Sequence, residues 1–369
     1  MSTPSLPAPI RVMVVDDSAI VRGLITRTLK TEPRIEVTAS CSNGEMAVAQ
    51  AARKAPDVII LDIEMPVMDG LAALPKLLEA NPQVRIIMAS TLTQRNAGIS
   101  LKALSLGATD YIAKPTTDRL NASEDFHREL IQKVIALGQS CQQRRKPAQS
   151  PDASPRPLEM TQPPPLRAHG NGGVMRRPRI IAIGSSTGGP QALLTLLGAL
   201  PRTVDCPIVI AQHMPATFTT VLAQHIGRAS GRPSAEAAHG MEIRPGHIYL
   251  APGDFHFQLA REGTACIARL SQTAAENFCR PSVDPLFRSV AQHFGAESCA
   301  VMLTGMGSDG CGGAKAMAAA GAPVIAQDEA TSVVWGMPGA VAQAGICSAI
   351  LPLPRIAGHL AALFERATV

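Results

Sequence analysis

The chain has 369 residues, of which 46% are hydrophobic and 3% are aromatic. This length predicts two domains, each large enough to bury a core of its own. The formal charge of +5 is carried by residues 138–178, because residues 11–137 and 179–369 each hold equal numbers of basic and acidic side chains. With neither half basic, a nucleic-acid-binding function is disfavoured and no nucleic-acid partner is expected.

The sequence shows neither the pattern of a targeting signal nor closely spaced pairs of cysteines. No apolar run approaches the roughly 20 residues of a membrane span, and residues 1–10 lack the basic and apolar regions of a signal peptide. The eight cysteines are scattered without CxxC spacing, which favours reduced thiols over disulfides or zinc. We therefore expect a cytoplasmic protein with no direct membrane insertion.

Short apolar strands alternate with helical segments through residues 11–137. This alternation predicts a flavodoxin-like α/β domain with a five-stranded, parallel, doubly wound sheet. The predicted strands are Arg11–Asp16, Ile35–Ala39, Asp57–Asp62, Val84–Ser90 and Thr109–Ala113, with helices such as Ala19–Lys30 and Leu71–Ala80 between them.

Residues 138–178 differ from both flanking segments in composition. They contain eight prolines, no aromatic residue, and seven basic side chains against Asp152 and Glu159. Such a segment cannot bury enough apolar surface to fold by itself, so we expect an extended linker. The alternative is that its arginines have a docking or localisation role.

Acidic residues follow two of the predicted strands in the first half. Asp16 and Asp17 come after the first strand and Asp62 ends the third, so their carboxylates should meet at one edge of the sheet. Hard oxygen ligands of this kind suit Mg²⁺, which would also relieve the repulsion among the three acids. Lys114 could offset the charge of a phosphorylated Asp62, and Ser90 could donate a hydrogen bond to a phosphoryl oxygen.

The spacing of these residues, together with the Met65-Pro66 and Lys114-Pro115 pairs, resembles a response-regulator receiver domain over residues 11–137. The resemblance implies that Asp16 and Asp17 bind the metal with Asp62. It further implies that Asp62 accepts phosphate from a chemotaxis histidine kinase, as in two-component systems, and that Ser90, Tyr111 and Lys114 act in the switch. The alternative is an ordinary flavodoxin-like fold with capping and turn carboxylates.

The second half, residues 179–369, again alternates strands and helices. This predicts a second doubly wound sheet with a small antiparallel insertion. The predicted strands are Ile180–Gly184, Pro207–Ala211 and Ser298–Thr304, the helices Gln191–Leu200, Phe218–Arg228 and Pro285–Phe294, and the antiparallel strands Ile248–Leu250, Phe255–Leu259 and Ala265–Leu270.

A serine stands at a sharp strand-to-helix turn in this half. The run Gly184-x-Ser186-x-Gly188 has the spacing of a nucleophile elbow, which exposes the serine at the carboxyl end of its strand. The alternative is a glycine-rich phosphate cradle, but the run lacks the full dinucleotide-binding pattern and the P-loop lysine.

The other members of a catalytic triad are available at neighbouring strand ends. His213 follows the strand Pro207–Ala211 and could take the serine proton, with His256 and His247 as competitors. Asp309 lies on the glycine-rich loop after Ser298–Thr304 and could orient that base, unless it serves only an Asp-Gly turn. Backbone N–H groups of Thr187 or Met306 could form an oxyanion hole. The order Ser…His…Asp differs from the Ser…Asp…His order of α/β-hydrolases.

These motifs, with Gln212–Pro215, Pro252-Gly253-Asp254 and Arg280–Asp284, resemble the catalytic domain of the chemotaxis protein-glutamate methylesterases. The resemblance implies Ser186 as nucleophile, His213 as base, Asp309 as its orienting group, and Met306 as an oxyanion donor.

The same resemblance implies a hydrolase that demethylates glutamate γ-methyl esters and deamidates glutamines on the cytoplasmic helices of chemoreceptors. It implies no cofactor in the catalytic half, and a receiver that covers the cleft until Asp62 is phosphorylated. Ser185 departs from the family pattern, in which alanine is common. The rival hypothesis is a receiver fused to a non-catalytic module that binds a nucleotide or phosphate.

Overall fold

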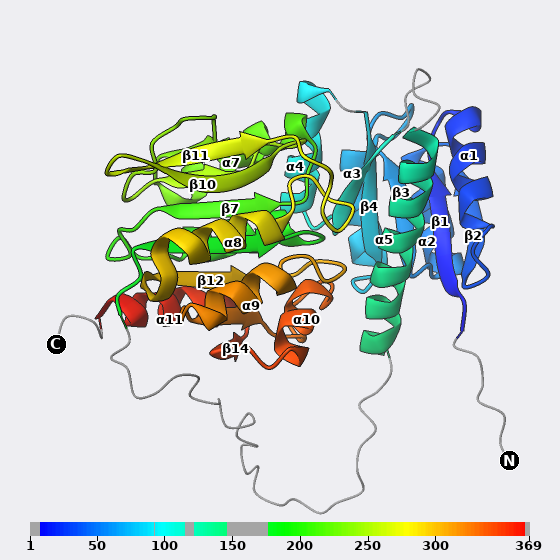
Figure 1. Ribbon diagram of the computed structural model, residues 1–369. Coiled ribbons are helices and arrows are strands. Elements are labelled where there is room, and N and C mark those ends of the chain that lie inside the picture. The colour runs from blue at the N-terminus through cyan, green and yellow to red at the C-terminus, as the bar shows by residue number, and fades with distance from the viewer. Residues whose placement is uncertain (1–7, 92, 115–121, 146–175, 366–369) are drawn as a thin grey trace, which may run out of the picture. The chain divides into compact units, whose positions relative to one another are not determined.

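The structure is a computed structural model that describes residues 8–91, 93–114, 122–145 and 176–365. The chain divides into two compact units, residues 1–155 and 156–369 (Figure 1). Each unit contains one main parallel sheet, and each is described by itself below.

The first unit has a five-stranded parallel sheet in the order β2-β1-β3-β4-β5. Every residue of its central strand β3 is buried, as expected for a parallel sheet covered by helices on both faces. This confirms the predicted flavodoxin-like fold. The strands are β1 Ile10–Val15, β2 Ile35–Cys41, β3 Val58–Asp62, β4 Arg85–Ser90 and β5 Asp110–Ala113, and the helices are α1 Ala19–Leu29, α2 Gly44–Lys54, α3 Gly70–Ala80, α4 Gln94–Ser105 and α5 Ala122–Arg145.

Short polar side chains determine where the first three helices begin. Ser18, Asn43 and Asp69 each accept a hydrogen bond from a backbone N–H in the first turn of α1, α2 and α3 respectively. Such N-caps typically stabilise a helix by about 0.5–2 kcal/mol relative to alanine. The caps of α1 and α3 therefore hold fixed the loops that carry the acidic residues after β1 and β3.

Helix α5 extends beyond the point at which the sequence predicted the linker to begin. Residues 138–145, predicted to open the linker, instead form the last turns of this helix. Leu137 and Cys141 are fully buried, Cys141 Sγ donates to the Gln83 carbonyl at 3.2 Å, and Gln142 Nε2 donates to Asp57 Oδ2 at 3.2 Å. These contacts hold a polar segment in a helix. Of the rest of the predicted linker, residues 146–175 lie outside the described residues, whereas residues 176–178 are described, and Arg177 Nη2 donates to Asp205 Oδ1 at 2.7 Å.

The second unit has a seven-stranded sheet in the order β14-β13-β12-β6-β7-β9-β8, in which every pairing is parallel. Its strands are β6 Ile180–Ser185, β7 Ile208–Gln212, β8 Ser234–Glu236, β9 Ile248–Leu250, β12 Ser298–Met302, β13 Val324–Gln327 and β14 Ala349–Leu351. Its helices are α6 Gly189–Gly198, α7 Ala216–Ser230, α8 Val283–Phe294, the 3-10 turn Gly295–Glu297, α9 Cys311–Ala319, α10 Met337–Gln343 and α11 Leu353–Glu365. Among the helices described in either unit, none is long and apolar enough to cross a membrane.

The predicted antiparallel insertion is present but smaller than expected. Strands β10 His256–Glu262 and β11 Ala265–Ser271 form an antiparallel hairpin. The prediction for Ile248–Leu250 was wrong, because this strand is β9 and pairs in parallel with β7 and β8. All three of its residues are buried within the main sheet, which is where an entirely apolar strand gains most from burial.

Both sheets place their strand ends in the same way. In the first unit β1 lies between β2 and β3, and in the second β6 lies between β12 and β7, so each is the point where strand order reverses. Ligands of open α/β sheets bind beyond the carboxyl ends of the strands at such a switch point. Asp62 ends β3 and Asp16 follows β1, whereas Ser186 follows β6 and His213 follows β7.

Candidate active site and phosphorylation site

Ser186 occupies the turn between β6 and α6. The turn needs glycine at position 188, where φ is +76° and a Cβ atom would lie 2.6 Å from Val333 Cγ2. The Ser186 N–H donates to the Thr304 carbonyl at 3.1 Å, and its own carbonyl accepts from the Gly189 N–H at 2.7 Å. The backbone of Ser186 is thereby bonded on both sides while the residue stays partly exposed.

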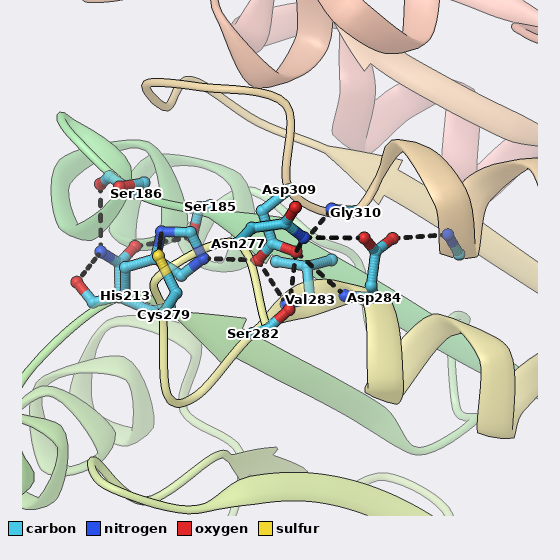
Figure 2. Close-up of polar contacts among 12 residues, drawn as sticks. Ser185, Ser186, His213, Asn277, Cys279, Ser282, Val283, Asp284, Asp309 and Gly310 are labelled. Atoms are coloured by element: carbon cyan, nitrogen blue, oxygen red, sulfur yellow. Dashed lines mark hydrogen bonds and ion pairs between the residues drawn. The ribbon is translucent and has the colours of Figure 1, made fainter. Parts of the chain in front are cut away.

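His213 lies at the neighbouring strand end and has a partner on each ring nitrogen. The backbone N–H of His213 donates to the Ser185 carbonyl at 3.2 Å, and this bond joins the ends of β6 and β7. Nε2 lies 2.7 Å from Asp309 Oδ2, and Nδ1 lies 3.4 Å from Cys279 Sγ (Figure 2). Within the described residues, no hydrogen bond joins Ser186 Oγ to His213. The structure therefore brings His213 and Asp309 into contact, with Ser186 beside them on the adjoining strand.

Asp309 is buried, and its carboxylate is surrounded by hydrogen-bond donors. Beyond His213, it accepts from Ser282 Oγ at 2.6 Å, the Val283 N–H at 2.6 Å and Asn277 Nδ2 at 2.8 Å (Figure 2). Val283 is the first residue of α8, so the carboxylate lies at the positive end of a helix dipole. Its position is thus set by two side chains and a helix terminus.

These contacts change the protonation of the pair. Burial by itself would raise the pKa of Asp309, but His213, Ser282 and the Val283 N–H outweigh burial and hold that pKa well below its usual range. Burial would lower the pKa of His213, but the Asp309 carboxylate and the Cys279 sulfur outweigh it and raise that pKa. Asp309 is therefore ionised at neutral pH, and it favours the protonated imidazole, as an orienting carboxylate does in a serine triad.

The two backbone groups predicted as oxyanion donors lie in the turns around Ser186. The loop after β12 passes directly beside it, since a Cβ atom on Gly305 would lie 3.0 Å from Ser186 Cβ. Neither the Thr187 N–H nor the Met306 N–H donates a hydrogen bond to any described residue. Donors without an internal partner are what an oxyanion hole requires.

The competing histidines bond elsewhere. His256 Nε2 lies 3.0 Å from the Ala274 carbonyl, and its Nδ1 accepts from the Ser282 N–H at 3.3 Å. His247 Nδ1 lies 2.9 Å from the Pro245 carbonyl. His256 therefore supports the backbone near Asp309, and neither ring is placed at the Ser186 turn.

Several residues that hold the site were not identified from the sequence. Gln212 and Ser282 belong to motifs noted there without a role, so their motif membership was the available signal. Asn277 and Cys279 had no such signal, because their contacts depend on how residues 272–282 fold back over His213. Asn277 Nδ2 donates to both Asp309 and Asp284, so it joins two carboxylates that would otherwise repel each other.

The acidic residues of the first unit also come together. Carboxylate oxygens of Asp16, Asp17 and Asp62 lie within 4.8 Å of one another. Lys114 Nζ lies 2.7 Å from Asp16 Oδ2 and 2.6 Å from Asp62 Oδ1. Burial raises the pKa of Asp62 to about 6 although Lys114 opposes that shift. One ammonium against three carboxylates leaves excess negative charge and free oxygen ligands, which fits a hard divalent cation.

The predicted switch residues occupy the two strands beyond β3. Ser90 ends β4 and is buried, and its Oγ donates to the Thr91 carbonyl at 3.2 Å. Tyr111 lies in β5 with its ring buried, and Lys133 Nζ lies 5.0 Å from the ring centroid. Strand β4 pairs with both β3 and β5, so Ser90 lies on the strand next to the one that Asp62 ends, and Tyr111 lies one strand further on.

A receiver fold with an acidic cluster, followed by an α/β domain with serine, histidine and aspartate at its switch point, defines a response regulator with an enzyme-like output domain. Family models agree: one described as a response regulator receiver domain matches residues 12–123, and one described as CheB methylesterase matches residues 181–360. The chain belongs to the protein-glutamate methylesterase/protein-glutamine glutaminase family of response regulators.

Two relatives identified by sequence support this membership over nearly the whole chain. "Protein-glutamate methylesterase/protein-glutamine glutaminase 1" of Paramagnetospirillum magneticum is 55% identical and covers 97% of each chain. The protein of the same name from Rhodospirillum rubrum is 53% identical over 96% of this chain and 95% of its own. The crystal structure of the Thermotoga maritima CheB methylesterase catalytic domain is 40% identical, covers 50% of this chain and 98% of its own, and has a TM-score of 0.49.

Proposed function

We propose that the second unit hydrolyses glutamate γ-methyl esters with a triad of Ser186, His213 and Asp309. The observation that carries this proposal is the 2.7 Å contact between His213 Nε2 and the buried Asp309 carboxylate, at the strand end beside the Ser186 turn. The names of the relatives support the substrate class. By resemblance, the esters are carried by cytoplasmic helices of chemoreceptors.

The reaction begins when Ser186 Oγ attacks the ester carbonyl carbon and its proton passes to His213. Because Nε2 is bonded to Asp309, the accepting atom is Nδ1, the nitrogen that Cys279 contacts in this structure. Asp309 stabilises the imidazolium that forms. The imidazolium then protonates the leaving methoxide, methanol departs, and a glutamyl ester of Ser186 remains. Water, deprotonated by His213, hydrolyses this acyl-enzyme and restores the serine.

The N–H groups of Thr187 and Met306 are the proposed oxyanion donors. Their lack of an acceptor among the described residues supports this role. Loss of one such donor typically costs about 3–4 kcal/mol of transition-state stabilisation.

The same acyl chemistry would deamidate glutamine, with ammonia in place of methanol as the leaving group. The names of the relatives include this glutaminase activity. Since every step uses side chains and backbone groups of this chain, the catalytic unit is proposed to need no cofactor.

The first unit is proposed to control this activity through phosphorylation of Asp62 by a chemotaxis histidine kinase. Asp16, Asp17 and Asp62 would hold Mg²⁺, which supplies positive charge to the phosphoryl oxygens when bound. Lys114 would neutralise a further oxygen, and Ser90 and Tyr111 would respond to the added charge. The unmodified receiver is proposed to restrict access to Ser186.

Methanol release from methylated receptor membranes tests the catalytic proposal. Ser186→Ala should lower the rate by a factor on the order of 10³ or more, since the nucleophile is lost. The matched control is Ser308→Ala, which changes an exposed serine on the loop before Asp309 and should keep the wild-type rate. Equal release by Ser186→Ala and wild type would contradict the triad.

A further inference from the structure

A buried amide joins the two strand ends that carry the proposed nucleophile and base. Gln212 is the last residue of β7 and is 2% exposed. Its Nε2 donates to the Ser186 carbonyl at 3.0 Å and to the His213 carbonyl at 3.1 Å. Its Oε1 accepts from Ser185 Oγ at 2.7 Å. One side chain therefore bonds the backbone of both residues.

The orientation of this amide is dictated by its neighbours. The carbonyls of Ser186 and His213 can only accept, so the NH₂ end of Gln212 must face them. The oxygen end must then face Ser185, whose hydroxyl is the donor it needs. Ser185 is fully buried, so removing its hydroxyl would leave a buried carbonyl oxygen without a partner, and such a loss is costly.

Gly189 provides the room for this arrangement. A Cβ atom at this position would lie 2.0 Å from Gln212 Oε1. The Gly189 N–H also donates to the Ser186 carbonyl at 2.7 Å, so that carbonyl is held from two directions. Position 189 needs glycine because the amide of Gln212 fills the space.

We propose that Gln212, oriented by Ser185, is a positioning residue that fixes the separation of Ser186 and His213 for proton transfer. This inference rests on the proposed triad and deepens it. Ser185 is a hydroxyl donor to the amide of Gln212, and it does not compete with Ser186 as a nucleophile. Ser185 and Gln212 act by fixing the distance and alignment of Ser186 and His213, and proton transfer is sensitive to both.

A double-mutant cycle on the full chain tests this role by kcat and KM for methyl-ester hydrolysis. Ser185→Ala should lower kcat about tenfold, and Gln212→Met about a hundredfold, with KM within about twofold of wild type. In the Gln212→Met background, Ser185→Ala should change kcat by less than about twofold, because Ser185 acts only through Gln212. Ser185→Cys, a weaker donor of similar size, should fall between serine and alanine and guards against a folding defect.

Ser289→Ala is the structural control. Ser289 Oγ is also buried and bonded on both sides, to the Leu259 N–H at 3.0 Å and the Leu286 carbonyl at 2.7 Å, but it bonds neither the Ser186 turn nor the residues around His213. Its loss should lower the melting temperature and leave kcat unchanged. The positioning role is overturned if Ser185→Ala keeps the wild-type kcat, or loses the same factor in both backgrounds, while Ser186→Ala is inactive. An active Ser186→Ala would instead overturn the triad itself.

Discussion

The imidazole of His213 is bonded on both nitrogens, which determines how the proposed reaction should depend on pH. A general base must be neutral to accept a proton. Asp309 and Cys279 both raise the pKa of His213, so the neutral form becomes dominant only at a higher pH than for an ordinary histidine. The rate kcat/KM should therefore rise with pH through this raised pKa.

Replacing Cys279 with alanine should shift this pH dependence. The Cys279 sulfur raises the pKa of His213, so its removal lowers that pKa and moves the acid limb of the kcat/KM profile to lower pH. The control is Cys311→Ala, whose sulfur contacts the Ala340 carbonyl and leaves His213 untouched. A limb that stays in place, or that moves to higher pH, would show that the sulfur has no such effect on the base.

Helix α5 stabilises the first unit with residues that lie beyond the predicted domain boundary at residue 137. A fragment of residues 1–137 lacks buried Cys141 and the bond from Gln142 to Asp57. Its free energy of unfolding should be about 2 kcal/mol lower than that of residues 1–145, because burying one side chain stabilises a fold by about that amount. Urea unfolding of both fragments measures this difference, with residues 1–155 as the control that should match 1–145. Equal midpoints for 1–137 and 1–145 would refute it.

Sequence patterns predicted the strands that form clear apolar runs and alternate with helical segments along the chain. They correctly placed Ser186 and His213 directly after strands and Asp309 on the loop that follows a third strand, because each strand is a clear apolar run. They failed for β9, since a short strand buried on both faces has no period that tells parallel from antiparallel pairing. They also could not identify Asn277, because its bond to Asp309, 32 residues away in the chain, exists only after the two loops have packed together.

At the scale of the whole molecule, both units carry their candidate site at the same topological position, but the side chains at that position differ in chemistry. In each, the strand order reverses beside a central strand, and the side chains proposed to be functional follow the adjacent strand ends. In the first unit these are carboxylates with one lysine, which suits a cation and a phosphoryl group. In the second they are a hydroxyl, an imidazole and a carboxylate, which suits acyl transfer. Regulation therefore requires a coupling between two separate sites.

That coupling is tested by esterase rates on methylated receptor membranes. A small-molecule phosphodonor with Mg²⁺ should raise the wild-type rate, on the order of fivefold or more. Deleting residues 1–145 should raise the rate similarly without the donor, because the proposed restriction by the unmodified receiver is gone. Asp62→Asn is the control: it lacks the phospho-acceptor and should not respond to the donor. If the deletion left the rate unchanged or lower while the donor still raised it, phosphorylation would be activating the catalytic unit directly, and the inhibitory role of the receiver would be wrong.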